Sequence, residues 1–449
     1  MSNFRGTIMA WLWAPRLLSP HATGAPLCAA LLLGLVAASC AGGAHETVVA
    51  PPTTQAAATV VSPVTVAPTV GPMLVGTPMP APSPRPGTRP PPATAPASGF
   101  TSVQLVGRSR LTPATGQFGR AAAFYVTGSA FNRSTIWRLD LSTLSVTRAY
   151  TDQEEGFEVQ GLTLSPRRDQ LAFTGFVRRF RGMVFLSRSS IMLLQADGVQ
   201  TRTVAATEGM SEYVAYPRWS PDGARLAYAH VNLEPGGAPP RTQLRILSLQ
   251  DGGTQVATQD GGEFFDWSPD GTELVIAQRG DQPKLAALAL RDGQLRSLWE
   301  DDALDFRGVA WQPGGIQVAV EVYSQADAHP ELEGLYLVNA VTGRRRKLVD
   351  GEISVLGWDP AGKRLAYLKA AGGTSSAWLF DMAVGAPAAL LDQDTVPPGS
   401  SSWSPNGDAL LLGVRSSSQS LCWVSIVSLK ERQLSELVPV DNLDPQPVW

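Results

Sequence analysis

The sequence predicts an all-β fold, a seven-bladed β-propeller of four-stranded blades preceded by a disordered tether rich in Pro, Thr and Ala. Three observations carry this prediction. A Trp recurs every 44 to 48 residues. Each repeat alternates short apolar strands with Pro-Gly turns and has no helical period. A sharp change of composition near residue 100 separates the repeats from a proline-rich segment. The repeat tryptophans are Trp219, Trp267, Trp311, Trp358, Trp403 and Trp449.

Residues 1–39 have the features of an export signal. Arg5 and Arg16 precede an apolar run, 25–39, that is too short to span a bilayer and fits a signal h-region. The run ends at Cys40 in "AASCAGG", which resembles the bacterial lipoprotein box. That resemblance implies lipidation of Cys40 and an extracytoplasmic protein bound to the cell membrane through its lipid only. An ordinary signal-peptide cut at the small residues before Cys40 is the alternative.

Residues 40–99 form the predicted tether. From residue 41 onward this segment contains fourteen prolines, no aromatic residue, and only Glu46, Arg85 and Arg89 as charges. It therefore buries too little apolar surface to offset the entropy of ordering. We expect an extended, mobile connection between the anchor and a folded domain at residues 100–449.

The stretch "YPRWSPDGARLAYAHV" shows how one repeat folds. The residues up to Trp219 are predicted to form the innermost strand of a blade, with the indole filling space between neighbouring blades. Pro fixes φ and Asp222-Gly forms the tight turn, so the chain returns as a second strand at 225–231. Two further strands follow at 242–249 and 254–259.

Six copies of this pattern stand in register, and the "WSPDG" motif resembles that of TolB-type propellers, which are relatives of the WD-repeat family. The resemblance covers residues 100–449 and implies a closed ring of blades. In TolB an α/β domain precedes the propeller, whereas here the leader and the tether take that place.

The last repeat predicts how the ring closes. Trp449 lies one period after the preceding repeat Trp, so it should end the first strand of a seventh blade. Residues 121–128, 135–141 and 145–151 look like the second, third and fourth strands of that blade. Joining both ends of the domain removes exposed sheet edges. The alternative takes 111–116 as a degenerate first strand.

Enzymatic motifs are scarce. We find no G-x-S-x-G elbow, H-E-x-x-H, C-x-x-C or phosphate loop, and we predict no cofactor. His230 and His329 lie in loop-like stretches and are interpreted as solvated, and Cys422 is interpreted as a small buried hydrophobe. The net charge of −3 gives no attraction to nucleic acid.

These observations favour a monomeric, non-catalytic binding or scaffold protein that takes a protein, a basic peptide or a cell-envelope glycan at the channel mouth. The alternative is a propeller-fold glycoside hydrolase or lyase that uses carboxylates at the same mouth.

Acidic residues gather in the connections from the fourth strand of one blade to the first strand of the next. A propeller places these connections on one face, so they should form an acidic rim that attracts a basic peptide or a divalent cation such as Ca²⁺. The alternative is a set of ordinary solvated loops, partly neutralised by Arg178, Arg179 and Arg181 from a long loop. The candidate rim residues are Asp152, Glu154, Glu155, Glu158, Glu208, Glu212, Asp260, Glu263, Glu300, Asp301, Asp302, Asp305, Asp350, Glu352, Asp392, Asp394, Asp441 and Asp444.

Overall fold

The computed structural model describes fourteen stretches of the chain, all of them C-terminal to residue 107. These are residues 108–110, 122–128, 133–143, 145–180, 184–234, 240–259, 261–278, 282–325, 329–371, 374–391, 401–415, 422–429, 433–440 and 446–449. The predicted leader, Cys40 and the tether lie outside the described residues. Within these stretches, no helix is long and apolar enough to cross a membrane.

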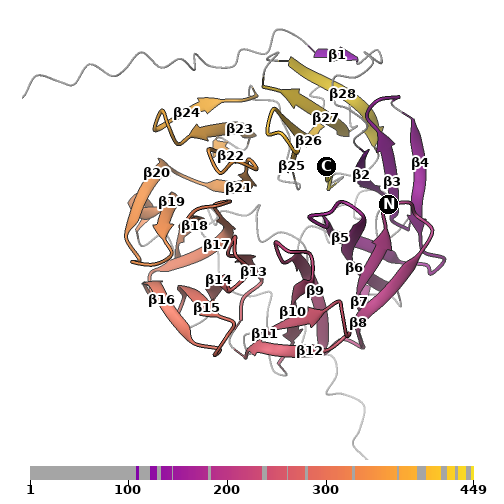
Figure 1. Cartoon of the computed structure of the whole chain (residues 1–449), viewed down its shortest axis with the longest axis horizontal. Helices are drawn as coiled ribbons and strands as arrows, with labels where there is room; N and C mark the ends of the chain where they lie inside the picture. The colour runs from indigo at the N-terminus through magenta and orange to yellow at the C-terminus, as the bar shows by residue number, and fades with distance from the viewer. Residues whose placement is uncertain are drawn as a thin grey trace, which may run out of the picture. The chain divides into compact units, whose positions relative to one another are not determined.

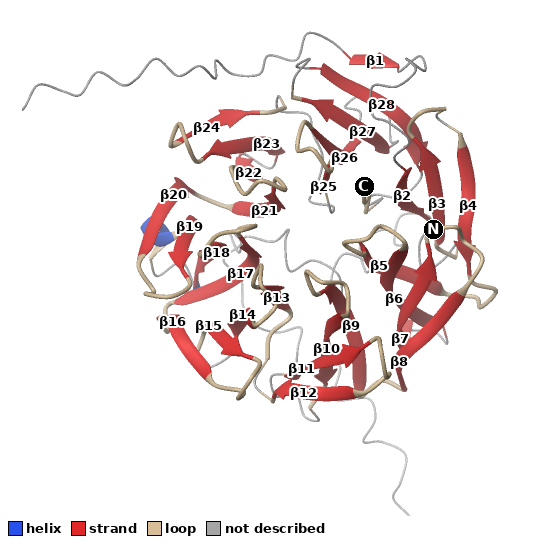
Figure 2. Ribbon diagram, viewed as in Figure 1, coloured by secondary structure: helices blue, strands red, loops and turns tan. Residues whose placement is uncertain are grey.

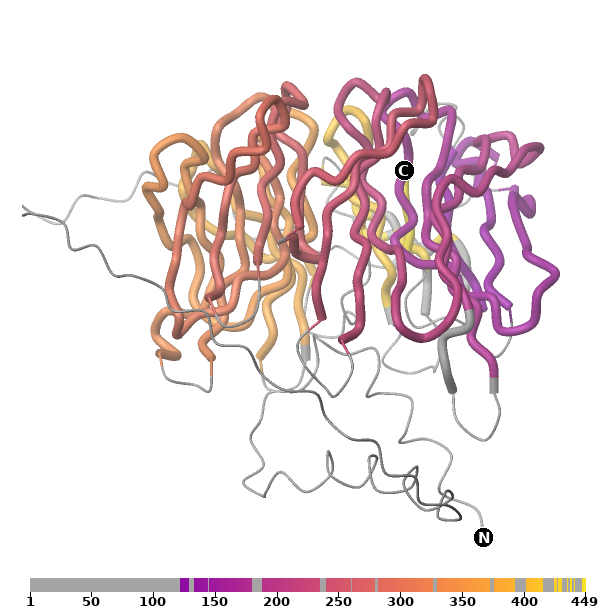
Figure 3. The backbone as a smooth tube through the Cα atoms, turned by 90° about the horizontal axis from the view of Figure 1, so that it is seen from below, coloured from indigo at the N-terminus to yellow at the C-terminus, as the bar shows by residue number. Residues whose placement is uncertain are grey.

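The described strands form seven sheets arranged as a ring, as the sequence predicts (Figure 1). Their strands run across the thickness of the ring (Figure 3). Blades 1 to 3 are β5 (Phe157–Leu164), β6 (Gln170–Phe180), β7 (Val184–Gln195) and β8 (Thr201–Glu208); β9 (Glu212–Trp219), β10 (Arg225–Asn232), β11 (Arg241–Ser248) and β12 (Thr254–Thr258); and β13 (Phe264–Trp267), β14 (Glu273–Gln278), β15 (Lys284–Ala289) and β16 (Leu295–Glu300).

The next three blades repeat the same antiparallel order, with each first strand nearest the axis of the ring (Figure 1). A short 3-10 helix, η3 (Pro330–Leu332), lies beside blade 4 (Figure 2). Blades 4 to 6 are β17 (Leu304–Trp311), β18 (Gln317–Ser324), β19 (Gly334–Asn339) and β20 (Arg345–Asp350); β21 (Ile353–Trp358), β22 (Arg364–Ala371), β23 (Thr374–Asp381) and β24 (Ala386–Ala389); and β25 (Ser402–Trp403), β26 (Ala409–Arg415), β27 (Cys422–Ser428) and β28 (Gln433–Val440).

Blade 7 joins the two ends of the propeller, which confirms the predicted closure. Its sheet contains β2 (Ala122–Thr127), β3 (Thr135–Asp140) and β4 (Val146–Thr151). Its inner position is taken by the C-terminal residues: Phe124 and Val448 form an antiparallel bridge in which each backbone N–H donates to the other's carbonyl at 2.8 Å. The alternative first strand at 111–116 lies outside the described residues.

Blade 6 has an additional strand that the sequence did not predict. The segment β1 (Arg108–Arg110) pairs in parallel with β28 and makes this blade five-stranded. A fifth strand satisfies backbone groups that an outermost strand would otherwise leave at an open edge. The chain therefore enters the propeller along the outer edge of blade 6.

The repeat tryptophans join neighbouring blades, as predicted. In four of them the indole N–H donates to a backbone carbonyl of the preceding blade, in each case from the residue before that blade's own Trp or its equivalent. These bonds are Trp219 to Thr163, Trp267 to Arg218, Trp358 to Ala310 and Trp403 to Gly357, at 3.1 to 3.4 Å. Trp311 differs, since its indole donates to Gly315 within its own blade at 3.1 Å.

The Ser-Pro-Asp-Gly turn is stabilised by hydrogen bonds among its own residues. The Ser220 hydroxyl donates to Asp222 at 2.5 Å, and the backbone N–H of Gly223 donates to the Ser220 carbonyl at 2.9 Å. Gly223 has a φ of 70°, a left-handed conformation that glycine adopts without strain. The same Ser-to-Asp bond recurs at Asp270, so both aspartates are turn formers, as predicted.

The buried hydroxyl of Tyr367 allows a test of what a polar group without a hydrogen-bond partner costs in stability. Tyr367 is fully buried between blades 4 and 5, and no described residue accepts its hydroxyl hydrogen. We expect Tyr367→Phe to leave stability unchanged or raise it slightly, because a desolvated hydroxyl without a partner is costly. Tyr213→Phe, which loses a 2.9 Å bond to Glu263, should cost about 1 kcal/mol in urea unfolding. A larger loss for Tyr367→Phe would show that its hydroxyl is satisfied.

Candidate functional site

The predicted acidic rim lies on one face of the ring. In blades 1 to 5 four strands follow one another in antiparallel order, so the fourth strand of a blade ends on the face from which the first strand of the next blade begins. Thirteen of the candidate carboxylates are described. The other five lie outside the described residues: Asp260, Asp392, Asp394, Asp441 and Asp444.

Several rim carboxylates have structural partners. Asp152 accepts the hydroxyl of Tyr150 at 2.7 Å and the backbone N–H of Glu154 at 2.8 Å, so it shapes the connection into blade 1. Glu154 forms ion pairs with Arg179 at 3.2 Å and with Arg188 at 2.7 Å. These contacts stabilise Asp152 and Glu154 side by side at the start of the connection between β4 and β5.

Arginines neutralise part of the rim, but they do so from a strand. Arg178 Nε lies 3.0 Å from Glu158, and both Arg178 and Arg179 belong to β6. The expectation that they lie in a loop is wrong, because β6 and β7 pair over eleven registered positions and extend the hairpin of blade 1. Arg181 lies outside the described residues.

His230 is buried, which corrects its interpretation as a solvated loop residue. It lies in β10, is 6% exposed, and its Nε2 is 2.8 Å from Glu212. The reason is that His230 lies within the strand, since β10 pairs with β9 as far as Asn232, one residue beyond the predicted second strand. His329 is half-exposed at the start of η3, where a solvated histidine was expected.

The remaining described rim residues divide into paired and exposed groups. Asp305 pairs with Arg307 at 2.8 Å, Asp350 with Lys347 at 2.6 Å, and Asp301 accepts the backbone N–H of Ala303. Five rim residues are exposed and form no ion pair with any described residue: Glu155, Glu208, Glu300, Asp302 and Glu352. The rim therefore retains a smaller negative charge than its sequence suggests.

The pKa of Glu352 departs from its usual range. Partial burial, and then the charge of Glu333, raise its pKa above the usual range, while Arg307 acts in the opposite direction. The part of the chain that the structure describes contains no group of three or more His, Cys, Asp or Glu placed to hold a metal ion. Binding of Ca²⁺ at the rim stays a prediction.

The innermost strands carry a feature that the sequence analysis missed. Three residues before the repeat Trp, or its equivalent Leu164 in blade 1, the backbone takes a positive φ in four blades. Two of these residues are Gly161 and Gly308, at 60° and 40°. In blade 2 the position is Tyr216, at 60°, a conformation that costs a non-glycine residue about 1 to 2 kcal/mol. Backbone strain of this kind is concentrated at functional sites.

Tyr216 is 36% exposed on the innermost strand of its blade, and Arg218, two residues further on, is exposed as well. β9, which carries both residues, is the strand of blade 2 nearest the axis of the ring (Figure 1). We call Tyr213, Tyr216, Arg218, Glu263 and Asp266 the axial patch. It spans the first strands of blades 2 and 3.

The axial patch is held together by contacts between these two blades. The Tyr213 hydroxyl donates to Glu263 at 2.9 Å. Burial, and then the charges of Glu263 and Tyr216, raise the pKa of Tyr213, so it stays a neutral donor. Burial also raises the pKa of Asp266, against the opposing effect of Arg218. Asp266 accepts the backbone N–H of Trp311 at 2.8 Å, which ties blade 3 to blade 4.

The arrangement of blades and turns agrees with a known family. A family model described as the TolB beta propeller domain matches residues 174–449. The chain belongs to the TolB beta-propeller family. A search of curated proteins gave no match.

Several solved structures are similar to this chain at low sequence identity. A puromycin hydrolase aligns with a TM-score of 0.54 and 14% identity, over 76% of this chain and 56% of the hydrolase. A puromycin-hydrolyzing peptidase of Mycobacterium tuberculosis has a TM-score of 0.50 and 14% identity, over 75% and 56%. TolB of Acinetobacter baumannii has a TM-score of 0.44 and 16% identity, over 72% and 81%. This chain thus spans little more than half the length of the two hydrolytic proteins.

In this TolB-type propeller the sequence gives no clear signal for the axial patch. When the repeats are aligned on their tryptophans, the position of Tyr216 is occupied in the other repeats by Gly161, Phe264, Gly308, Val355, Ser400 and Gln446, so an aromatic residue is not exceptional there. The positive φ of Tyr216 is seen only in the structure. The rim hypothesis, which rests on the connections between blades, does not include this position.

Proposed function

We propose that this propeller is a non-catalytic binding protein, and that it takes a protein, peptide or glycan partner at the axial patch. The observation that carries the proposal is Tyr216, an exposed aromatic side chain held in a left-handed backbone conformation on an innermost strand. Tyrosine is favoured at binding surfaces because its ring contributes apolar area and its hydroxyl hydrogen-bonds. Arg218 beside it supplies a charge that fixes orientation.

The state of the nearby carboxylates supports binding over catalysis. General acid and base groups need a carboxyl that can reach the substrate. Glu263 accepts the Tyr213 hydroxyl, and Asp266 accepts two backbone N–H groups, from Trp267 at 3.0 Å and from Trp311 at 2.8 Å. These bonds support a structural role for both carboxylates. The hydrolytic activity of the longer relatives is therefore not part of the proposal.

The axial patch can be tested with variants that separate binding from folding. Tyr216→Gly removes the ring and relieves the backbone strain, so we expect unchanged or higher stability together with loss of the partner. Tyr216→Phe keeps the aromatic face and should retain most of the affinity. Partners are captured from cell-envelope extracts by the wild-type protein, identified, purified and titrated against each variant by calorimetry.

The controls decide between the proposal and its competitors. Val199→Ser, an exposed change in the turn between β7 and β8, should leave binding intact. Equal affinity of Tyr216→Gly and wild type for every purified partner would refute the axial patch. Turnover of peptide or polysaccharide substrates by the purified protein, lost in Glu263→Gln, would show instead a propeller hydrolase or lyase.

The cellular address is part of the same proposal. Lipid at Cys40 would hold the propeller outside the cell membrane, with residues 40–99 giving it reach. We expect Cys40→Ser to move the protein from the membrane fraction to the medium or the soluble fraction, as judged by immunoblotting of fractionated cells. Recovery of wild-type protein in the soluble fraction to the same extent would exclude lipidation.

A further inference from the structure

The outer edge of blade 4 carries the longest run of consecutive cations in the chain, Arg344 to Lys347. Three of these residues begin β20, the outermost strand of its blade, and no described strand pairs with its outer edge (Figure 1). The backbone N–H and C=O groups of such an edge are available to another strand. Arg344, Arg345 and Arg346 are all exposed.

The four cations divide according to the alternation of the strand. Arg345 lies over the ring of Trp299 at 4.3 Å, and Lys347 lies 5.7 Å from the ring of Tyr336 and 2.6 Å from Asp350. Trp299 and Tyr336 belong to one core cluster, so Arg345 and Lys347 point to the side of blade 3. Alternation puts Arg344 and Arg346 on the opposite side of the strand, and neither forms an ion pair with any described residue.

The other outermost strands carry fewer cations. β12 and β24 contain no charged residue, β4, β8 and β16 contain one arginine each, and β1, the outermost strand of blade 6, contains Arg108 and Arg110. One charge is enough to discourage pairing between sheet edges. Protection of the edge therefore does not account for the run of four cations that ends in β20.

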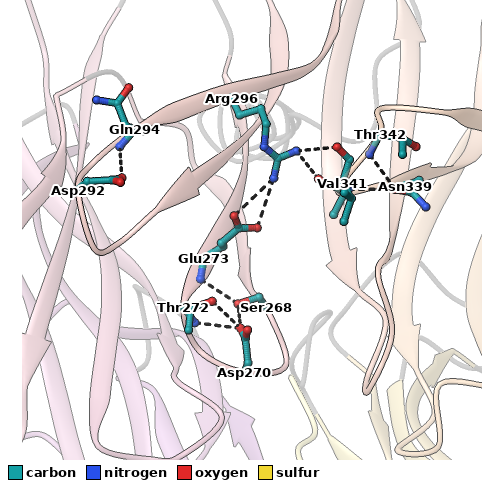
Figure 4. A network of polar contacts seen from close by, with 11 residues as sticks. Ser268, Asp270, Thr272, Glu273, Asp292, Gln294, Arg296, Asn339, Val341 and Thr342 are labelled. Atoms are coloured by element: carbon teal, nitrogen blue, oxygen red, sulfur yellow. Dashed lines mark hydrogen bonds and ion pairs between the residues drawn. The ribbon is translucent and has the colours of Figure 1, made fainter.

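The surroundings extend this surface toward blade 3. Arg296 of β16 contacts both carboxylate oxygens of Glu273 and donates to the carbonyls of Ala340 and Val341 (Figure 4). Val341 itself is 64% exposed, in the turn that leads into the cationic run. The exposed apolar side chain of Val341 thus lies near Arg344 and Arg346, which form no ion pair with any described residue. Apolar and charged groups side by side suit the recognition of a peptide.

We propose that the outer edge of β20 binds an acidic peptide segment that pairs with it as an additional strand. Arg344 and Arg346 are spaced by two residues, about 6.6 Å along a strand, which matches carboxylates at alternate positions of a partner strand. Guanidinium groups bind carboxylates through two parallel hydrogen bonds. The partner's backbone satisfies the open edge, and its side chains supply the complementary charge.

A peptide fits this edge better than a membrane or a charged glycan. Lipid headgroups and glycans offer charge but no ladder of N–H and C=O groups to match the strand edge. The cations also lie on the circumference of the ring, along a single strand (Figure 1). This site is separate from the axial patch and does not depend on it.

The test uses the full chain and a fluorescein-labelled peptide that alternates Thr and Glu, followed by fluorescence anisotropy at low salt. We expect saturable binding, weakened roughly tenfold in Arg344→Ser/Arg346→Ser, since two exposed ion pairs are lost. The matched control is Arg148→Ser/Arg202→Ser, which removes the same charge from exposed positions on β4 and β8 and should bind as wild type does.

A second peptide separates strand pairing from charge alone. It carries the same number of Glu residues with Pro in place of each Thr, which removes every second backbone N–H and fixes φ at about −65°, away from the values of a paired strand. We expect it to bind at least roughly tenfold more weakly. Equal binding of both peptides, equal loss in the two double variants, or binding confined to phosphatidylglycerol vesicles would each overturn the proposal.

Discussion

Removal of residues 446–449 should open the propeller and lower its melting temperature far more than an ordinary terminal truncation does. Trp449 is 4% exposed and packs in a core cluster with residues of blades 5, 6 and 7, and Val448 is 7% exposed and packs with residues of blades 7 and 1. The backbone N–H of Trp449 donates to Ser402 at 3.0 Å, and Gln446 contacts the backbone of blade 1 through Leu162 and Val159. The deletion therefore separates three blades at once.

The expected cost is about 5 kcal/mol or more, from the lost Trp and Val burial and the lost bridge to Phe124. Thermal unfolding followed by circular dichroism measures it. The matched control is Trp449→Phe, which keeps a buried ring and should lose only about 1 to 2 kcal/mol. A melting curve of the deletion variant that overlays the wild-type curve would mean that the C-terminal residues do not close the ring.

The second large effect is expected at Asp359. This residue precedes the proline of the turn in blade 5, a position that is Ser in most other repeats and Asp only here. Asp359 is 1% exposed and accepts the backbone N–H groups of Lys363 and Arg364 and, at 2.9 Å, the side chain of Arg364. Arg364 in turn donates to the Gly407 carbonyl of blade 6 at 2.7 Å and lies over the ring of Trp403. This cluster connects blades 5 and 6.

We expect Asp359→Ala to cost about 3 kcal/mol in urea unfolding, because it leaves a largely buried arginine without its counter-charge and two N–H groups unpaired. Asp359→Ser restores the turn hydrogen bond that serines make in other repeats and should lose roughly half as much. Asp222→Ala, at an exposed aspartate of the same turn in blade 2, should cost under about 1 kcal/mol. Equal effects of Asp359→Ala and Asp222→Ala would contradict a role of the ion pair in joining blades.

The number and order of blades could be predicted because each repeat depends on interactions between residues close together in the sequence. Each Trp ends an inner strand, and each Pro-Asp-Gly fixes a turn whose geometry needs no distant contact. The closing strand followed from the same period, since Trp449 ends the chain in the position of an inner strand while the first described strands lack one. The TolB-type family assignment rests on these repeated residues too.

What sequence patterns failed to predict depends on how the strands pair and on which side chains the pairing brings together. His230 was interpreted as solvated, but it lies within β10, whose pairing with β9 brings the ring against Glu212. Arg178 lies in a long hairpin whose length is set by pairing with β7 rather than by apolar content. The parallel addition of β1 to β28 has no local signal, because parallel pairing needs no turn.

The candidate site was predicted in part. Charge composition located an acidic face, but it could not show which carboxylates pair with Arg178, Arg179 and Arg188 on neighbouring strands. Composition also gives no weight to Tyr216, whose importance comes from a backbone angle. Binding at the acidic rim therefore stays a prediction, and the axial patch is proposed from the geometry of the innermost strands.

The closed ring is the claim on which the axial patch depends, since only closure places the innermost strands around one axis. Hydrogen exchange at the Val448 amide tests it most directly, because that N–H donates to Phe124 across the junction between the two ends of the propeller. A closed ring predicts exchange as slow as that of the buried strand β10, near the rate of global unfolding. Exchange of Val448 at the rate of an unprotected amide, with β10 still protected, would contradict closure.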